Sequence, residues 1–201
     1  MKRREIFFIP AAMAAGPALA KPGWTPLFDG KTLNGWAPIG HARWEARDGA
    51  IIGRQGAGGE AGELMTTGQW KNFDLELEWR MKWPGNSGIW FRYSNAKSAY
   101  QADIIDEASY PGVLSGSLYC AGKMFIAENR DPASVKKDGW NRMRILAHGD
   151  EITVEQNGKR VIHLRDATFP GPGSVGIQVH PGKKYDGMEA HVRRIRIRPL
   201  D

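Results

Sequence analysis

The chain has 201 residues, of which 41% are hydrophobic and 25% charged, enough to enclose one sizeable apolar core. The formal net charge of +6 is modest and spread along the chain, which argues against a nucleic acid partner. Cys120 is the only cysteine, so an intrachain disulfide is excluded. We expect this thiol to be buried and inert, because no histidine stands at a spacing typical of a catalytic pair.

The first 20 residues have the pattern of an export signal. Lys2, Arg3 and Arg4 form a basic start, residues 6–15 are an apolar run, and residues 18–20 read Ala-Leu-Ala, a small-x-small cleavage site. The apolar run is too short to remain as a membrane span. We therefore expect a signal peptide over residues 1–20 and one mature domain over 21–201, periplasmic or secreted and without membrane contact. The paired arginines leave the general secretory and twin-arginine routes both open.

The remaining sequence predicts an all-β protein. Short runs rich in β-branched and aromatic residues alternate with Gly, Pro, Asn and Asp turns, which favours two stacked antiparallel sheets. Asp48-Gly49 and Asn157-Gly158 predict tight hairpin turns, because these pairs supply the positive φ angles that such turns require. The expected strands are 44–46, 50–53, 63–66, 73–82, 88–93, 99–105, 117–120, 140–148, 151–156, 159–164, 173–180 and 188–198.

Residues 73–81 alternate without interruption and predict the clearest strand. Apolar side chains at odd positions face the core, and Asp74, Glu76 and Glu78 face outward. Two carboxylates on one strand face are also what a glucanase uses, so that reading stays open. The simpler interpretation is a solvent-facing edge of the sandwich. Near the C-terminus, arginines at 194, 196 and 198 alternate with apolar residues, a pattern typical of the solvent face of a terminal strand.

Two neighbouring strands carry the most informative pattern. Residues 86–93 read Asn-Ser-Gly-Ile-Trp-Phe-Arg-Tyr, and residues 100–104 read Tyr-Gln-Ala-Asp-Ile. Period-two alternation sends Gln101 and Asp103 to one face and their apolar neighbours to the other. We expect Arg92 to share the face of Gln101 and Asp103. Such a polar face within an aromatic sheet is typical of a carbohydrate-binding or carbohydrate-processing cleft.

An ordered set of motifs resembles the 3-keto-disaccharide hydrolase domain family over nearly the whole mature chain. The matching segments are 28–36 (Phe-Asp-Gly-Lys-Thr-Leu-Asn-Gly-Trp), 62–64, 72–75, 86–92, 100–103, 139–141, 157–158 and 176–180. The resemblance implies a jelly-roll β-sandwich of the concanavalin-A-like lectin and glucanase type. It also implies action on glycosides that carry a ketone at C3. The chain departs from many members at 100–106, where an acid and an amide have exchanged places.

A 3-keto glycoside can lose its C1 substituent by elimination, since the ketone acidifies the hydrogen on C2. The site then needs a base near C2, a donor near the C3 oxygen and an acid near the leaving oxygen. We expect Asp103, Arg92 and His180 in these three roles. The residues expected to orient or stack on the sugar are Glu63, Gln101, Tyr119 and Gln178.

Other interpretations remain open from the sequence. Arg92 and Asp103 can instead form a structural ion pair, and the same cleft would serve a carbohydrate-binding module without catalysis. We expect no cofactor, and the histidines lack the spacing of a zinc site, although Asp103, Asp106 and Glu107 leave a calcium ion open. The expected partners are an oligosaccharide or glycoside ligand and a sugar 3-oxidoreductase that supplies the ketone.

Overall fold

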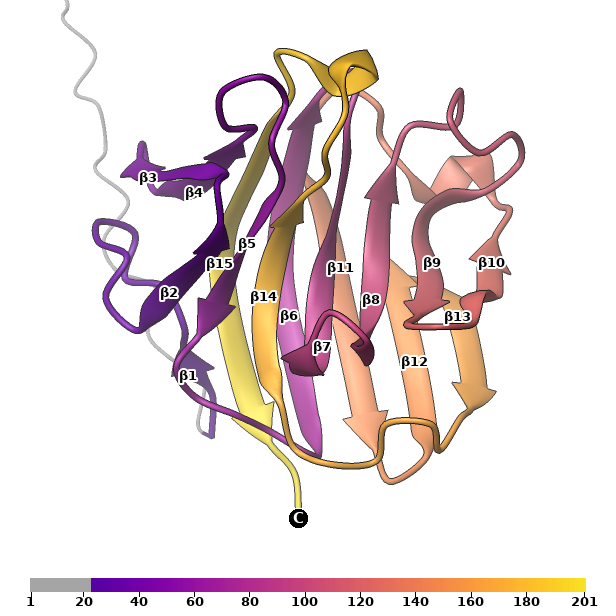
Figure 1. Cartoon of the computed structure of the whole chain (residues 1–201). Coiled ribbons are helices and arrows are strands. Elements are labelled where there is room, and N and C mark those ends of the chain that lie inside the picture. The colour runs from indigo at the N-terminus through magenta and orange to yellow at the C-terminus, as the bar shows by residue number, and fades with distance from the viewer. Residues whose placement is uncertain (1–22) are drawn as a thin grey trace, which may run out of the picture.

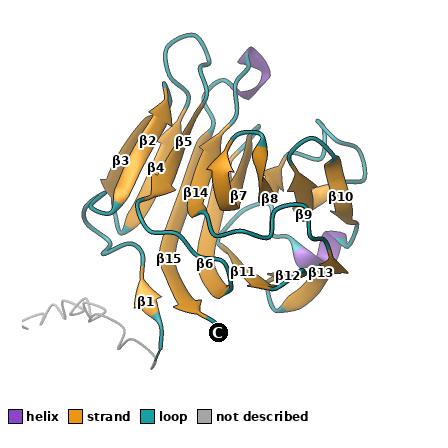
Figure 2. Ribbon diagram, turned by 60° about the horizontal axis from the view of Figure 1, so that its bottom comes forward, coloured by secondary structure: helices purple, strands orange, loops and turns teal. Residues whose placement is uncertain are grey.

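The computed structural model describes residues 23–201, so the expected signal peptide lies outside the described residues. Two antiparallel sheets pack face to face, with sheet B in front of sheet A in Figure 1. Figure 2 shows strand and loop almost throughout, with short 3-10 turns at Pro132–Ser134 and Lys183–Tyr185. Over residues 23–201, no helix is long and apolar enough to cross a membrane. The predicted all-β sandwich is confirmed.

Each sheet combines runs of consecutive strands with strands from distant parts of the chain. Sheet A has the order β13 (Lys159–Arg165), β12 (Glu151–Gln156), β11 (Asn141–His148), β6 (Phe73–Lys82), β15 (Glu189–Pro199), β4 (Ala50–Arg54) and β3 (Arg43–Arg47), with β1 (Thr25–Pro26) also on β15. Sheet B has the order β10 (Met124–Asn129), β9 (Leu114–Cys120), β8 (Ser98–Ile105), β7 (Asn86–Asn95), β14 (Ser174–Val179), β5 (Gly62–Thr66) and β2 (Trp36–Gly40).

The core fills the space between the sheets, and β6 shows why these sequences form strands. Phe73, Leu75, Leu77 and Trp79 are at most 2% exposed and enter this core, as the alternation predicts. However, β6 lies between β11 and β15 in the middle of sheet A, and Asp74 is 1% exposed, so the interpretation of the acidic row as a solvent-facing edge of the sandwich is wrong. Cys120 is fully buried in the same core, as expected.

The two predicted hairpin turns are confirmed by their backbone angles. Asp48 and Gly49 have φ values of 53° and 74°, and Asn157 and Gly158 have 50° and 83°. Consecutive positive φ angles match the twist of the flanking strands, so these turns fix the registers of β3 with β4 and of β12 with β13.

The strands that the sequence did not predict lie at the margins of the sheets. β2 ends the order of sheet B and contains Pro38, which an edge strand tolerates because one side of its backbone is unpaired. β10 ends the same sheet on the other side, and its pairing with β9 is irregular. Neither segment alternates clearly, so period-two analysis passes over them.

Candidate functional site

Strand pairing in sheet B brings three of the expected site positions into one transverse row. Asp103 on β8 pairs with Gly88 on β7. Gln178 on β14 pairs with Gly88 on one side and with Glu63 on β5 on the other. Adjacent strands lie about 4.8 Å apart, so the Cα atoms of Asp103 and Glu63 are about 14 Å apart. The row lies on the outer face of sheet B, because the apolar residues that alternate with these positions along each strand enter the core.

A second row runs beside the first and contains two aromatic side chains. Gln101 pairs with Tyr119 on β9 and with Trp90 on β7, and Gly176 on β14 separates Trp90 from Met65. The Trp90 ring centroid lies 6.0 Å from that of Tyr119. Expected sugar-binding residues are therefore neighbours of an indole that the sequence reasoning did not single out. The signal was present, since alternation places Trp90 and Gly88 on one face.

Two glycines in the central strands let long side chains lie flat on this face. A Cβ at Gly88 would stand 2.5 Å from Cδ of Gln101, so the Gln101 side chain crosses directly over Gly88. A Cβ at Gly176 would stand 2.1 Å from Sδ of Met65 in the same way. Because Gly88 has no side chain, the Gln101 amide can lie next to the row that contains Asp103.

Asp103 is the most unusual ionisable group on this face. Its side chain is buried, and its Oδ1 atom has no hydrogen-bond partner in the described chain. Burial raises the pKa of Asp103 well above the ordinary value of 3.8, because a carboxylate there loses its water without gaining a partner. The alternative of a structural ion pair between Asp103 and Arg92 is not borne out among the described residues.

Two buried donors of the second row are also unpaired. Nε2 of Gln101 and Nε1 of Trp90 have no acceptor within the described chain. Seven buried side-chain atoms of residues 23–201 are in this state, and three of them belong to Trp90, Gln101 and Asp103. A buried polar atom without a partner destabilises a fold by about 1–3 kcal/mol, so their concentration here marks this face as a candidate site.

Glu63 and Tyr93 extend the same face toward β5. Burial raises the pKa of the Glu63 carboxyl, which is half-buried and forms no ion pair with a described residue. Burial also raises the pKa of the Tyr93 hydroxyl, and the Glu63 charge adds to that shift. The Tyr93 ring lies 5.7 Å from that of Trp90, so Tyr93 closes the aromatic row.

His180 follows the last residue of β14 at the rim of this face. Its backbone N–H donates to the carbonyl of Asn86, and its Nδ1 atom lies 2.8 Å from the carbonyl oxygen of Pro181. A carbonyl only accepts, so Nδ1 carries the proton and Nε2 is left without a partner in the described chain. The ring stands edge-on to Tyr185 at 5.5 Å. From strand spacings, its Cα lies about 12 Å from that of Asp103.

Arg92 does not lie on this face, so the expectation that it shares one with Asp103 is wrong. A register shift and a φ of 47° at Arg92 interrupt the alternation of β7. The guanidinium is buried, and it donates to the carbonyls of Lys71 at 2.8 Å, Gly149 at 2.8 Å and Phe169 at 3.5 Å. Arg92 thus ties three chain segments together and is not available to a ligand beside Asp103.

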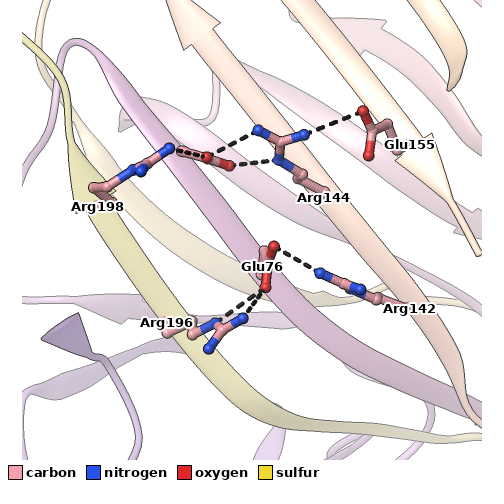
Figure 3. A network of polar contacts seen from close by, with 7 residues as sticks. Glu76, Arg142, Arg144, Glu155, Arg196 and Arg198 are labelled. Atoms are coloured by element: carbon pink, nitrogen blue, oxygen red, sulfur yellow. Dashed lines mark hydrogen bonds and ion pairs between the residues drawn. The ribbon is translucent and has the colours of Figure 1, made fainter. Parts of the chain in front are cut away.

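The outer face of sheet A holds the acidic row of β6 in a network of ion pairs (Figure 3). Asp74 accepts from Arg144 at 2.8 Å and from Arg198 at 2.9 Å. Glu76 accepts in the same way from Arg142 and Arg196, one on each neighbouring strand. Carboxylates held between two arginines are poor nucleophiles and acids, so the structure gives no support to a two-carboxylate glucanase at β6.

The acidic group proposed for calcium is dispersed. Asp103 lies on the sheet face, whereas Oδ1 of Asp106 accepts from the backbone N–H of Ala108 in the following turn. Within residues 23–201, no three His, Cys, Asp or Glu side chains gather in a way that would hold a metal ion.

Comparisons with known proteins give the chain its family. A protein-family model described as the 3-keto-alpha-glucoside-1,2-lyase-like domain matches residues 23–198. A 3-keto-disaccharide hydrolase from Bacteroides thetaiotaomicron is 30% identical over 167 residues, 70% of this chain. The matched part spans 58% of that relative's length.

Solved structures place the fold. A Bacillus subtilis protein of unknown function with a galectin-like fold has a TM-score of 0.69 at 13% identity, covering 87% of this chain and 94% of its own. The carbohydrate-binding module CBM66 from Bacillus subtilis has a TM-score of 0.64 at 20% identity, covering 82% and 95%. The lectin-type sandwich that the motifs implied is therefore confirmed. With most of its length matched by the family model, the chain belongs to the 3-keto-alpha-glucoside-1,2-lyase-like family.

Proposed function

We propose that this protein is a carbohydrate-active hydrolase that removes the C1 substituent of 3-keto glycosides. The observation that carries the proposal is the group of unpaired buried atoms on one aromatic face: Nε1 of Trp90, Nε2 of Gln101 and Oδ1 of Asp103. The two donors would hydrogen-bond to the C3 oxygen as the ketone becomes an enolate, and the acceptor would take the proton from C2. The family match and the 3-keto-disaccharide hydrolase relative support the same class of substrate.

In the proposed reaction Asp103 acts as the base. It takes the proton from C2, and the C2 electron pair forms the C2–C3 double bond of the enolate. The enolate then collapses: the C3 ketone re-forms, a double bond forms between C1 and C2, and the C1–O bond breaks with its electron pair on the glycosidic oxygen. Gln101 and Trp90 donate to the enolate oxygen, the role that the sequence suggested for Arg92. His180 in its imidazolium form, which carries a proton on Nε2 as well as on Nδ1, protonates the leaving oxygen through Nε2. Water then adds across C1 and C2, which completes a net hydrolysis without a cofactor.

Access to Oδ1 of Asp103 requires a side chain to move, because this unpaired oxygen is covered in this structure. Gln101 is suited to that movement, since its amide nitrogen is not held by a hydrogen bond and it lies across Gly88. Gln178 and Glu63 would orient hydroxyls on the far side of Gly88, and Tyr119 would contact the sugar ring. An export signal at residues 1–20 would place this chemistry in the periplasm or outside the cell, and a sugar 3-oxidoreductase would supply the substrate.

Product analysis in D₂O tests the proposal. The protein is incubated with 3-keto glucosides and with the unoxidised parents. We expect aglycone release only from the keto forms, with deuterium at C2 of the released sugar, because water supplies the new C2 proton. Asp103→Asn should lower kcat by about 10²–10⁴. Asp106→Asn, which removes a carboxylate of the adjacent turn, should leave the rate unchanged. Release without C2 deuterium, or from the parents, would refute the elimination.

A carbohydrate-binding module without catalysis is the second candidate. It is favoured by the fold similarity to a carbohydrate-binding module and by the aromatic row of Trp90, Tyr93 and Tyr119. A binding module needs no base, so Asp103→Asn would then retain affinity for a glycoside within a few fold. Saturable binding of glycosides by the wild type, with no turnover of any keto form, would favour this candidate.

A further inference from the structure

A pocket of about 440 Å³ opens on the outer face of sheet A, on the opposite side of the sandwich from Asp103. It lies where β6 ends and β15 begins. Ala50 and Ile52 form an apolar floor, and Arg80, Trp140 and His191 stand around it. The volume is in the range of small-ligand sites, and one monosaccharide ring would fill only part of it.

His191 and Glu189 fix the position of Arg80 at this pocket. Nε2 of His191 lies 3.0 Å from Oε2 of Glu189, and Nδ1 lies 3.5 Å from Nη2 of Arg80. A guanidinium only donates, so Nδ1 must accept and Nε2 must carry the proton. The other Glu189 oxygen lies 3.2 Å from Nε of Arg54. Glu189, which also pairs with Arg54, therefore fixes the orientation of the His191 imidazole.

Arg80 differs from the other arginines of this face. Arg144, Arg196 and Arg193 each donate to a carboxylate of β6, at positions 74, 76 and 78. Arg80 is the next outward residue of the same strand, and no carboxylate of the described chain pairs with it. Its contacts are the His191 nitrogen and the Trp140 ring, whose centroid lies 5.1 Å from Cζ. Most of its five N–H donors thus remain free beside the opening.

We infer that this pocket binds a monosaccharide that carries a carboxylate, such as a hexuronate. The carboxylate would occupy the free fork of Arg80, which has the geometry for two parallel hydrogen bonds. The pocket is much larger than a carboxylate alone. Arg193 covers part of the half-buried Trp140 indole, with its Cζ 3.8 Å from the ring centroid, and the remainder of the indole and the apolar floor offer contact to a sugar ring. Asp48 and Lys82 at the rim would accept from and donate to hydroxyls.

Titration with sodium glucuronate tests the inference, with the Trp140 indole resonance followed by NMR. We expect saturable shifts at millimolar ligand. The affinity of Arg80→Gln for glucuronate should be at least about tenfold lower than that of the wild type, since a charge-assisted hydrogen bond is lost. Arg194→Gln is the matched control, because Arg194 is 70% exposed on the same sheet and pairs with Glu78. Asp103→Asn should bind glucuronate as the wild type does, so the result is independent of the proposed reaction.

Two further probes separate the sugar from the charge. Glucose lacks the carboxylate and should cause no saturable shift, whereas acetate lacks the ring and should bind more weakly than glucuronate. Equal affinity for acetate and glucuronate would overturn the inference, because the ring would then contribute nothing. Unchanged glucuronate binding by Arg80→Gln, or no shift in the wild type, would also overturn it.

Discussion

Replacing Asp103 by Asn should make the protein more stable, by an amount that grows with pH. Burial raises the pKa of Asp103 well above 3.8, so the folded state keeps a proton that the unfolded chain releases once the pH exceeds about 4. Between about pH 4 and the raised pKa of the folded state, the wild type therefore loses about 1.4 kcal/mol of unfolding free energy per pH unit. The Asp103→Asn variant lacks this loss.

Urea unfolding followed by tryptophan fluorescence, at steps between about pH 3 and pH 8, measures the effect. The wild type and Asp103→Asn should coincide at the acidic end and diverge as the pH rises. A difference that stays constant with pH would refute the reasoning, as would a variant that is less stable throughout. Either result would mean that the Asp103 carboxylate is ionised and partnered in the folded protein.

Asp166 provides a control of opposite sign. Burial alone would raise its pKa, but hydrogen bonds from Thr168, Tyr100 and Lys123 outweigh burial and lower the pKa to about 2. Its contribution to stability is present above about pH 4 and is lost as the pH falls toward 2. Asp166→Asn should therefore be less stable than the wild type at neutral pH, by about 2 kcal/mol, and the difference should vanish in acid.

Three further predictions concern the same face and its surroundings. Gly88→Ala should lower kcat/KM for a 3-keto glucoside at least about tenfold in steady-state assays, because the new Cβ displaces Gln101; an unchanged value would contradict that placement. Arg92→Lys should lower the unfolding free energy by about 2–4 kcal/mol while folded protein keeps its kcat; a stable but inactive variant would return Arg92 to the reaction. The wild-type kcat/KM should rise with pH through the raised pKa of Asp103, since only the carboxylate accepts a proton; a flat profile in Asp103→Asn is the check.

Period-two alternation predicts the face on which a side chain lies only where the strand is regular. On β8 it is unbroken, so Gln101 and Asp103 were correctly placed on one outer face, opposite Tyr100 and Ala102. On β7 it is interrupted at Arg92, and no residue type in Trp-Phe-Arg-Tyr announces a positive φ. A single irregular residue therefore moved the expected donor away from the site.

Other features depend on pairing between distant strands, which spacing along the chain does not reveal. Trp90 becomes part of the site because β7 lies between β8 and β14, and the neighbours of Arg80 come from β15 and from the segment before β11. The unpaired state of Asp103 Oδ1 is likewise a property of the packed structure. Sequence alone indicated which residues were polar and on which face, but not which of them lacked a partner.

The position of Arg92 has a consequence for how the sandwich opens. Its guanidinium holds the carbonyls of Lys71, Gly149 and Phe169, which precede β6, follow β11 and precede β14. Those segments connect strands of both sheets, and one side chain joins them. Separation of any one of them would leave a buried cation short of acceptors, so the three should open together as one cooperative unit. Their amides should accordingly share a single hydrogen-exchange free energy, close to that of global unfolding.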